Sequence, residues 1–287
     1  MDLCNINQIK GLLNRHGFRF SKSMGQNFLI DPAIPQRIAA ASGAGPGYGV
    51  LEIGPGIGPL TQQLAQLADQ VAAVELDRAL LPILQETMHD YTNVSIIPGD
   101  ILKINLPELA ATAFPGLVPI VCANLPYNIT TPVLTALLEA KCFTSITVMI
   151  QREVAKRICA GPRTSDYGAF SLYCQYHATC ELLFEVPPHS FIPAPKVTSA
   201  VIQLTPTPEP PVPVVDKNLF FRIVKASFAM RRKTLVNGLA NGFSGQLTKA
   251  EVTDLLQSCG FPTNIRGEQL SLSDFAQLTQ AFHTALS

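Results

Sequence analysis

The sequence lacks several features that would assign it to a class of protein at once. It has no apolar run as long as the roughly 18 residues of a membrane helix, and Met1-Asp2-Leu3 lacks the basic and apolar regions of a signal peptide. The seven cysteines and five histidines are scattered, without a C-x-x-C pair. We therefore expect no disulfide framework, no bound metal and no membrane partner, and we predict a cytoplasmic protein with reduced thiols.

Charge is also scarce. Only 15% of the residues are charged, and the 21 basic residues are balanced by 21 acidic ones. A net charge of zero means that any surface for nucleic acid must come from local clusters of lysine and arginine. The 287 residues, 47% of them hydrophobic, suffice for one large domain and a smaller one.

Short apolar runs alternate with helical patterns through most of the chain. Strands that are apolar throughout are buried on both faces, so they indicate a mostly parallel sheet that helices cover on each side. The pattern predicts a Rossmann-like α/β domain followed by a small all-α domain. The predicted strands are 50–53, 71–74, 94–97, 120–123, 146–150, 170–180 and 197–204, and the later helices are 216–229, 231–241, 248–257 and 271–284.

A proline-rich stretch, 206–215, divides the chain. Its closely spaced prolines favour a stiff, extended linker. We therefore predict an α/β domain over residues 1–205, whose residues 1–30 form an N-terminal extension, and a helical domain over residues 216–287.

Candidate ligand-binding residues follow the predicted strands. The turn Gly54-Pro55-Gly56-Ile57-Gly58 would let the backbone approach a ligand closely, because glycine has no Cβ. Glu75 could accept hydrogen bonds from both hydroxyls of a ribose, and Asp100 could accept one from an adenine amine. These residues fit S-adenosylmethionine as well as NAD. A structural turn, a solvated strand-end acid and a capping aspartate are the alternatives.

The segment Asn124-Leu125-Pro126-Tyr127 helps to decide between these two candidate cofactors. The exocyclic amine of adenine is a poor nucleophile, because its lone pair is delocalised into the ring. The side-chain carbonyl of Asn124 and the backbone carbonyl of Leu125 or Pro126 could accept both amine hydrogens and favour a pyramidal nitrogen. Tyr127 could stack on the base, a contact worth about 1–3 kcal/mol. Although Asn-x-Pro is also a common turn, the segment favours an S-adenosylmethionine-dependent methyltransferase, since an NAD enzyme needs no such motif.

Longer segments accompany these motifs, and their order is as informative as their residues. They are Phe20-x-Lys22-x-x-Gly25-Gln26-Asn27-Phe28-Leu29, Glu52-Ile53-Gly54-Pro55-Gly56, Val74-Glu75-x-Asp77, Gly99-Asp100, Asn124-Leu125-Pro126-Tyr127-Asn128-Ile129, Gln151-Arg152-Glu153-Val154-Ala155, Tyr167-Gly168, Phe191-x-Pro193-x-Pro195-Lys196-Val197-x-Ser199-Ala200-Val201 and Phe228-Ala229-x-Arg231-Arg232-Lys233-Thr234-Leu235. Over nearly its full length the chain resembles the KsgA family of ribosomal RNA adenine dimethyltransferases.

The resemblance implies a reaction and a set of site residues. The reaction is the transfer of two methyl groups to each of two adjacent adenines near the 3′ end of 16S ribosomal RNA, in the small subunit or its precursor. The residues implied to contact S-adenosylmethionine are Gln26, Asn27, Leu29, Gly54, Gly56, Glu75, Asp100 and Asn124. Those implied to handle the target adenine are Asn124, Leu125, Pro126 and Tyr127, with Phe191 stacking on its other face.

Phe191 lies in a proline-stiffened loop, which suits stacking, but a core aromatic is the alternative there. The chain also departs from the family in two respects. Thr198 stands where the family usually has Asp, and the neutral chain is unusual for a binder of ribosomal RNA. Both departures bear on tight RNA binding more than on the chemistry.

Three clusters of basic residues could bind RNA phosphates. A solvated helix face is the alternative for each. The run 231–233 favours RNA, because no acidic residue sits nearby in the sequence to neutralise it. The clusters are Lys10, Arg15, Arg19 and Lys22, then Arg152, Lys156 and Arg157, and then Arg222, Lys225, Arg231, Arg232 and Lys233.

Other functions stay open on the sequence alone. The first is an Erm-type enzyme that methylates 23S ribosomal RNA, although the neutral charge and the block 191–197 favour the small-subunit reaction. A DNA adenine methyltransferase would need a target-recognition domain, which we do not find. A ribosome-assembly factor, in which binding matters more than catalysis, and an NAD dehydrogenase complete the set. We expect a monomer.

Overall fold

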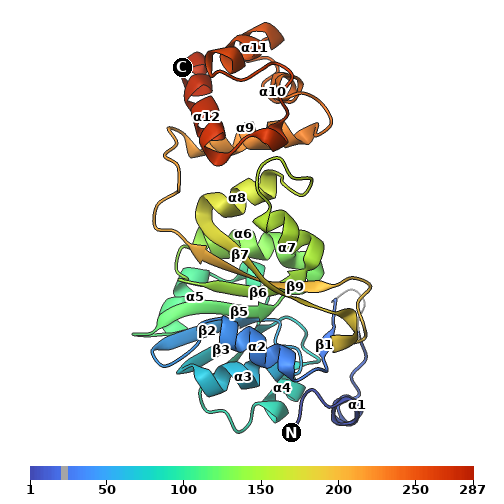
Figure 1. Ribbon diagram of the computed structural model, residues 1–287. Helices are drawn as coiled ribbons and strands as arrows, with labels where there is room; N and C mark the ends of the chain where they lie inside the picture. Colours follow the sequence, from blue (N-terminus) through green and yellow to red (C-terminus); the bar gives the residue numbers. More distant parts are fainter. Residues whose placement is uncertain (21–24) are drawn as a thin grey trace. The chain divides into compact units, whose positions relative to one another are not determined.

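The computed structural model describes residues 1–20 and 25–287, so that Lys22 lies outside the described residues. The chain forms two compact units (Figure 1). One comprises Met1–Ala155 and Cys180–Pro206, and the other comprises Lys156–Thr179 and Thr207–Ser287. No helix in the described part of the chain combines the length and the hydropathy that a membrane span requires.

A seven-stranded sheet forms the centre of the first unit, in the order β4-β3-β2-β5-β6-β9-β7. The pairs β2–β3, β3–β4, β2–β5 and β5–β6 are parallel, whereas β9 runs antiparallel to β6. The prediction of a Rossmann-like, mostly parallel sheet is therefore confirmed. The strands are β2 (Tyr48–Ile53), β3 (Gln70–Glu75), β4 (Val94–Pro98), β5 (Val118–Asn124), β6 (Ile146–Gln151), β7 (Ala178–Val186) and β9 (Ser199–Pro206).

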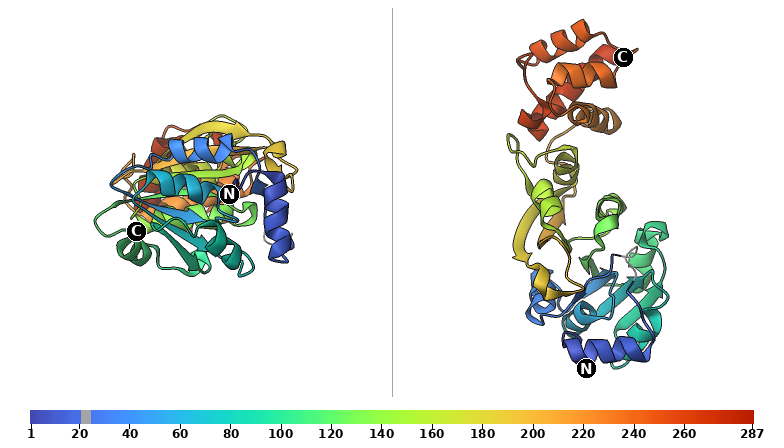
Figure 2. Two further views of the ribbon diagram at one scale, coloured as in Figure 1. Left: turned by 90° about the horizontal axis from the view of Figure 1, so that it is seen from below. Right: turned by 90° about the vertical axis from the view of Figure 1, so that its right-hand side faces the viewer.

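Helices cover this sheet on both sides (Figure 2). On one face, Ile38 of α2 and Leu64 of α3 pack with Val50 and Ile120 of the strands in a common buried cluster. The start of α3 follows from its sequence: Gly58 has a φ of 96°, which suits glycine, and Pro59 supplies the φ of a first helical residue. The helices of this unit are α1 (Ile6–Arg15), α2 (Ala33–Ala41), α3 (Pro59–Leu67), α4 (Leu81–Thr87), α5 (Leu106–Ala113), α6 (Thr130–Ala140) and the start of α7 (Arg152–Cys159).

The order of the strands locates a crevice. The chain passes outward from β2 to β3 and β4, and then returns to β5 on the other side of β2. In a doubly wound sheet, ligands bind beyond the carboxyl ends of the strands at such a reversal. The loops after β2 and β5 therefore flank the expected site.

The N-terminal extension is fastened to this end of the unit. Its short strand β1 (Phe28–Leu29) pairs antiparallel with β8 (Phe191–Ile192), which places Leu29 opposite Phe191. The Phe28 ring also packs against Phe18 and Phe20, with centroid distances of 6.0 and 5.2 Å. Helix α1 joins the same apolar cluster as α4.

The second unit is helical and has its own core. Phe220, Phe243, Phe275 and Phe282 are fully buried in it. Its helices are the end of α7, α8 (Ala169–His177), α9 (Lys217–Ala229), α10 (Leu235–Gly242), α11 (Lys249–Ser258) and α12 (Leu272–Leu286), with the 3-10 turn η5 (Gly267–Gln269).

The structure differs from the sequence prediction at several places in this unit. The predicted helix 231–241 begins only at Leu235, so that the basic run 231–233 precedes α10. The predicted strand 170–180 is mostly helix α8, because Leu172 and Tyr176, four residues apart, bury one helical face in the core. Residues 156–179 also belong to this unit, not to the α/β unit as predicted. Within the predicted linker 206–215, Val212 is 9% exposed and packs into the helical core.

Candidate cofactor and target-base site

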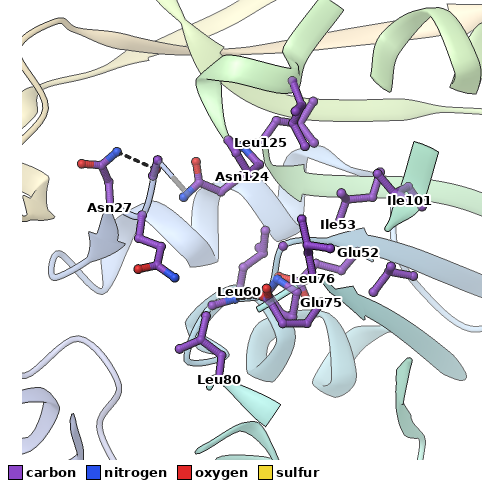
Figure 3. A pocket seen from close by; sticks show the side chains of 18 of the residues that line it. Asn27, Glu52, Ile53, Leu60, Glu75, Leu76, Leu80, Ile101, Asn124 and Leu125 are labelled. Carbon is purple, nitrogen blue, oxygen red and sulfur yellow. Dashed lines mark hydrogen bonds between the residues drawn. The ribbon is translucent and has the colours of Figure 1, made fainter. Parts of the chain in front are cut away.

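One pocket opens at the carboxyl ends of four parallel strands, and residues 25–29 of the N-terminal extension also line it (Figure 3). Its lining contains every residue expected to contact the cofactor and the whole segment Asn124–Tyr127. The strands thus bring together groups that lie up to 100 residues apart. The expected residues in the lining are Gln26, Asn27, Leu29, Gly54, Gly56, Glu75, Asp100, Asn124, Leu125, Pro126 and Tyr127.

The glycine turn after β2 needs glycine for both conformation and space. Gly54 and Gly56 have φ angles of 67° and 64°, in the left-handed region that other residues rarely adopt. A Cβ on Gly56 would also approach the Phe28 ring to 3.2 Å. The turn therefore presents bare backbone to the pocket.

Glu75 ends β3 and is held by the backbone around it. Its Oε2 accepts a hydrogen bond from the Gly56 amide (3.3 Å), and its Oε1 accepts one from the Asp77 amide (2.8 Å). Burial raises the pKa of Glu75, and these two hydrogen bonds oppose the shift. Each carboxylate oxygen can accept a second hydrogen bond, so the group can still receive two ribose hydroxyls.

The N-terminal extension is tied to the same corner of the pocket. Gln26 donates from Nε2 to Oδ2 of Asp77 (2.6 Å), and Asn27 donates to the carbonyl of Gly25 (3.1 Å; Figure 3). The extension therefore reaches the acids at the end of β3 through side-chain hydrogen bonds as well as through strand β1.

Glu52 is a pocket residue that the sequence analysis did not single out as a ligand. It is 1% exposed, and its Oε2 has no hydrogen-bond partner among the described residues. Burial raises its pKa to about 8, and the nearby charge of Glu75 adds to the shift. A carboxyl inside the otherwise apolar run of β2 is the signal that could have found it, because an unpartnered buried acid is costly.

Asp100 follows β4 and has a structural partner of its own. Its Oδ1 accepts a hydrogen bond from the Leu102 amide (3.1 Å), and its Oδ2 lies 3.7 Å from Nζ of Lys103. The capping alternative is thus present in the structure. It does not exclude a ligand, because Asp100 also lines the pocket.

The segment after β5 presents one free side-chain amide and one free carbonyl. No described residue hydrogen-bonds to the carboxamide of Asn124. The carbonyl of Pro126 accepts from the Ile129 amide (3.2 Å) and the Thr130 hydroxyl (3.3 Å), which uses both of its lone pairs. No described residue donates to the carbonyl of Leu125. Of the two backbone carbonyls that the sequence left open, Leu125 is the available one.

Tyr127 and Phe191, the two predicted stacking residues, have different surroundings. The Tyr127 hydroxyl shares a hydrogen bond of 2.6 Å with that of Ser199, and burial raises its pKa. Phe191 does not line the pocket among the described residues: it is 3% exposed in the apolar core, opposite Leu29. Its contact with a base stays a prediction, and its position here is that of the core alternative.

The pocket has a distinct charge. Glu52, Glu75 and Asp100 contribute carboxyl groups, and no lysine, arginine or histidine is found among the described residues that line it. Such a lining favours a cationic ligand and disfavours the pyrophosphate of NAD.

Several basic residues predicted to bind RNA are already engaged. Arg152 lies near Glu153 and Glu185 (3.3 and 3.5 Å), and Arg222 bonds to the Gly242 carbonyl and stacks over Phe243 at 4.1 Å. The expectation that no acid neutralises the run 231–233 is wrong for Arg231, because folding brings Glu268 to 3.2 Å. Arg232 and Lys233 are exposed, and no described residue pairs with them.

Comparison with known proteins identifies related sequences and folds. The family model described as ribosomal RNA adenine dimethylase matches residues 17–271. The proteins named ribosomal RNA small subunit methyltransferase A from Shouchella clausii and Alkaliphilus metalliredigens are 45% and 48% identical to this chain. These alignments cover 99% of this chain and 97% of the former relative, and 94% of this chain and 94% of the latter.

Solved structures share the fold at lower identity. A dimethyladenosine transferase from Plasmodium falciparum superposes with a TM-score of 0.73 at 24% identity, covering 90% of this chain and 98% of that one. The 23S rRNA methyltransferase ErmE gives a TM-score of 0.68 at 25% identity, covering 90% of this chain and 100% of that one.

Proposed function

The chain belongs to the ribosomal RNA adenine dimethylase family, and from this we propose that it dimethylates two adjacent adenines near the 3′ end of 16S ribosomal RNA. S-adenosylmethionine is the methyl donor in this proposal, and the small ribosomal subunit or its precursor is the substrate. The enzyme acts in the cytoplasm as a monomer.

The observation that carries the proposal is an acidic pocket that also holds the carboxamide of Asn124. S-adenosylmethionine carries a sulfonium and an ammonium group, and the carboxylates of Glu75 and Asp100 offset positive charge in a partly buried site. Asn124 lines the same pocket, and none of the residues that the structure describes hydrogen-bonds to its carboxamide. A dehydrogenase reading needs neither feature.

The residues of the loop after β5 prepare the adenine amine. The side-chain oxygen of Asn124 and the carbonyl of Leu125 accept its two hydrogens, which localises the nitrogen lone pair for attack. S-adenosylmethionine supplies an electrophilic methyl group on sulfur. Because the Leu125 peptide is held at the end of β5 by the hydrogen bond from its amide to the Met149 carbonyl (3.1 Å), the dipole of its carbonyl needs little rearrangement in the transition state. Tyr127 stacks on the base, and Glu75 holds the cofactor ribose.

The helical unit contributes a surface for RNA phosphates. The exposed Arg232 and Lys233 are its proposed contacts, and Arg163 and Arg266 lie on segments that the fold brings next to them. An exposed cluster of this kind compensates for the zero net charge of the chain, because phosphate binding depends on local positive charge.

The test uses small ribosomal subunits from a strain that lacks this gene. They are incubated with the purified protein and labelled S-adenosylmethionine, and the modified nucleoside is identified after digestion. Dimethyladenosine near the 3′ end of the small-subunit RNA is the expected product. Label in large-subunit RNA instead would support the Erm-type alternative. Binding without label, together with normal subunit maturation by Asn124→Ala, would support an assembly factor.

A further inference from the structure

Arg231 lies between α9 and α10 and bonds to two other segments of the helical unit. Its Nε donates to Oε2 of Glu268 at 3.2 Å. Its Nη2 donates to the carbonyls of Ser165 and Tyr167, the latter at 3.1 Å. One guanidinium group therefore holds the loop before α8 and the 3-10 turn η5 at the same time.

The segments that Arg231 joins carry exposed basic residues of their own. Arg163 precedes Ser165 in the loop before α8, and Arg266 begins the turn that contains Glu268; both are exposed. Together with 231–233 the three segments hold five basic residues and two acidic ones, Asp166 and Glu268. The net positive charge of the surface thus depends on segments that are 35 to 103 residues apart.

Backbone hydrogen bonds show how closely these segments meet. The Arg163 amide donates to the Glu268 carbonyl (2.7 Å), and the Leu235 amide donates to the Ile265 carbonyl (2.7 Å). Arg163 itself has a φ of 68°, a conformation that non-glycine residues adopt rarely and that its surroundings must hold. Beyond it, the loop is anchored by Tyr167, which is buried and packs on Phe228 at 6.0 Å. Between these anchors, hydrogen bonds from Arg231 to the Ser165 and Tyr167 carbonyls join the loop to the segment before α10.

We propose that Arg231 is a positioning residue that assembles the RNA-binding surface rather than a principal phosphate contact. Its charge is offset by Glu268, and its planar fork satisfies a carboxylate and two backbone carbonyls at once. Lysine cannot reproduce this geometry, because its ammonium group is a single compact donor on a flexible stem. Arg163, Arg232, Lys233 and Arg266 then face the phosphates. This inference rests on the proposed function, which supplies the RNA.

The two substitutions Arg231→Lys and Arg232→Lys provide a matched test in the full-length protein, because each keeps the charge. Affinity is measured against a fragment of 16S ribosomal RNA that contains the 3′ end, over a range of salt concentrations. Amide hydrogen exchange is measured over 161–168 and 265–269. Arg231→Lys is expected to lower RNA affinity by about tenfold or more and to speed exchange in both segments. We expect the same two effects in Arg231→Gln. Arg232→Lys is expected to leave exchange in both segments unchanged and, because it keeps the charge of a proposed phosphate contact, to lower affinity less than Arg231→Lys does, whereas Arg232→Gln is expected to lower affinity more and to reduce the salt slope by about one.

Wild-type affinity and exchange in Arg231→Lys would overturn the proposal, because a simple phosphate contact tolerates lysine. Glu268→Gln is a second test that leaves Arg231 in place. Faster exchange over 161–168 supports the positioning role of Arg231, and unchanged exchange counts against it. The proposed RNA-binding function is tested separately. If Arg232→Gln with Lys233→Gln leaves RNA affinity unchanged, the RNA surface is wrong, while the exchange data still decide the role of Arg231.

Discussion

The hydroxyls of Tyr127 and Ser199 share a hydrogen bond of 2.6 Å that joins the loop after β5 to the first residue of β9. Ser199 is fully buried, and strand pairing places it opposite Gln151 of β6. A ring on a short loop is thereby attached to a rigid strand. The position of the proposed stacking platform is then set by the sheet as well as by its own loop.

Removal of this hydrogen bond should affect the target base more than the cofactor. We expect Ser199→Ala to lower kcat/KM for RNA by about tenfold, the cost of about one such hydrogen bond, with unchanged affinity for S-adenosylmethionine. Tyr127→Phe removes the same bond and serves as the matched variant. The double variant should be no worse than either single one, because each breaks one shared interaction. Additive losses would show that the two hydroxyls act independently.

Asn124 and Leu125 should differ in their response to substitution. Asn124→Ala removes a side-chain acceptor and should lower the rate of methylation by at least about a hundredfold, with RNA affinity retained. Leu125→Met keeps both the backbone carbonyl and the side-chain volume, so its rate should stay within a few-fold of wild type. Single-turnover methylation of small subunits measures both. An equal loss in the two variants would contradict a role of Leu125 through its backbone alone.

The glycine turn can be tested with a control that separates strain from crowding. Gly56→Ala combines a φ of 64° with a Cβ 3.2 Å from Phe28, whereas Gly245→Ala has a φ of 81° and no neighbour within 4 Å. Strain at positive φ costs about 1–2 kcal/mol in both. Only Gly56→Ala should also weaken the binding of S-adenosylmethionine, measured by calorimetry. Equal affinity in the two variants would contradict close approach of the turn to the cofactor.

The buried carboxyl of Glu52 should make the stability of the protein depend on pH. Its pKa is raised from an ordinary value of 4.5 to about 8, so the folded state binds this proton more tightly than the unfolded state does. The stability that results is fully present below pH 4.5 and is lost as the pH rises through about 8. As the pH rises through this window, the free energy of unfolding of the wild type should therefore fall by a few kcal/mol relative to that of Glu52→Gln. Denaturant titrations at several pH values measure it, and a difference that does not vary with pH rules the shift out.

Local pattern was enough to locate most of the elements and motifs. Strands 50–53, 71–74, 94–97, 120–123 and 146–150 all lie within observed strands, and the motifs after four of them line one pocket. This works because buried strands are apolar along their whole length and because parallel strands end at the same edge of a sheet. The same reasoning was wrong for 170–180, which it predicted to be a strand. Aromatic residues also occur on the buried faces of helices, and here they lie on helix α8.

The sequence by itself therefore determined the sheet, the glycine turn and the residues that meet at the strand ends, because these depend on neighbours in the chain and on one general rule of topology. Tertiary structure decided that Phe191 is buried opposite Leu29 and that Arg231 faces Glu268. It also decided that, among the described residues, the Leu125 carbonyl and one carboxyl oxygen of the buried Glu52 have no hydrogen-bond partner. Each of these depends on the burial of a group or on contact between distant segments. Burial and such contacts arise only when the chain packs, so local pattern gives at most a signal, as the acid in the apolar run of β2 does for Glu52.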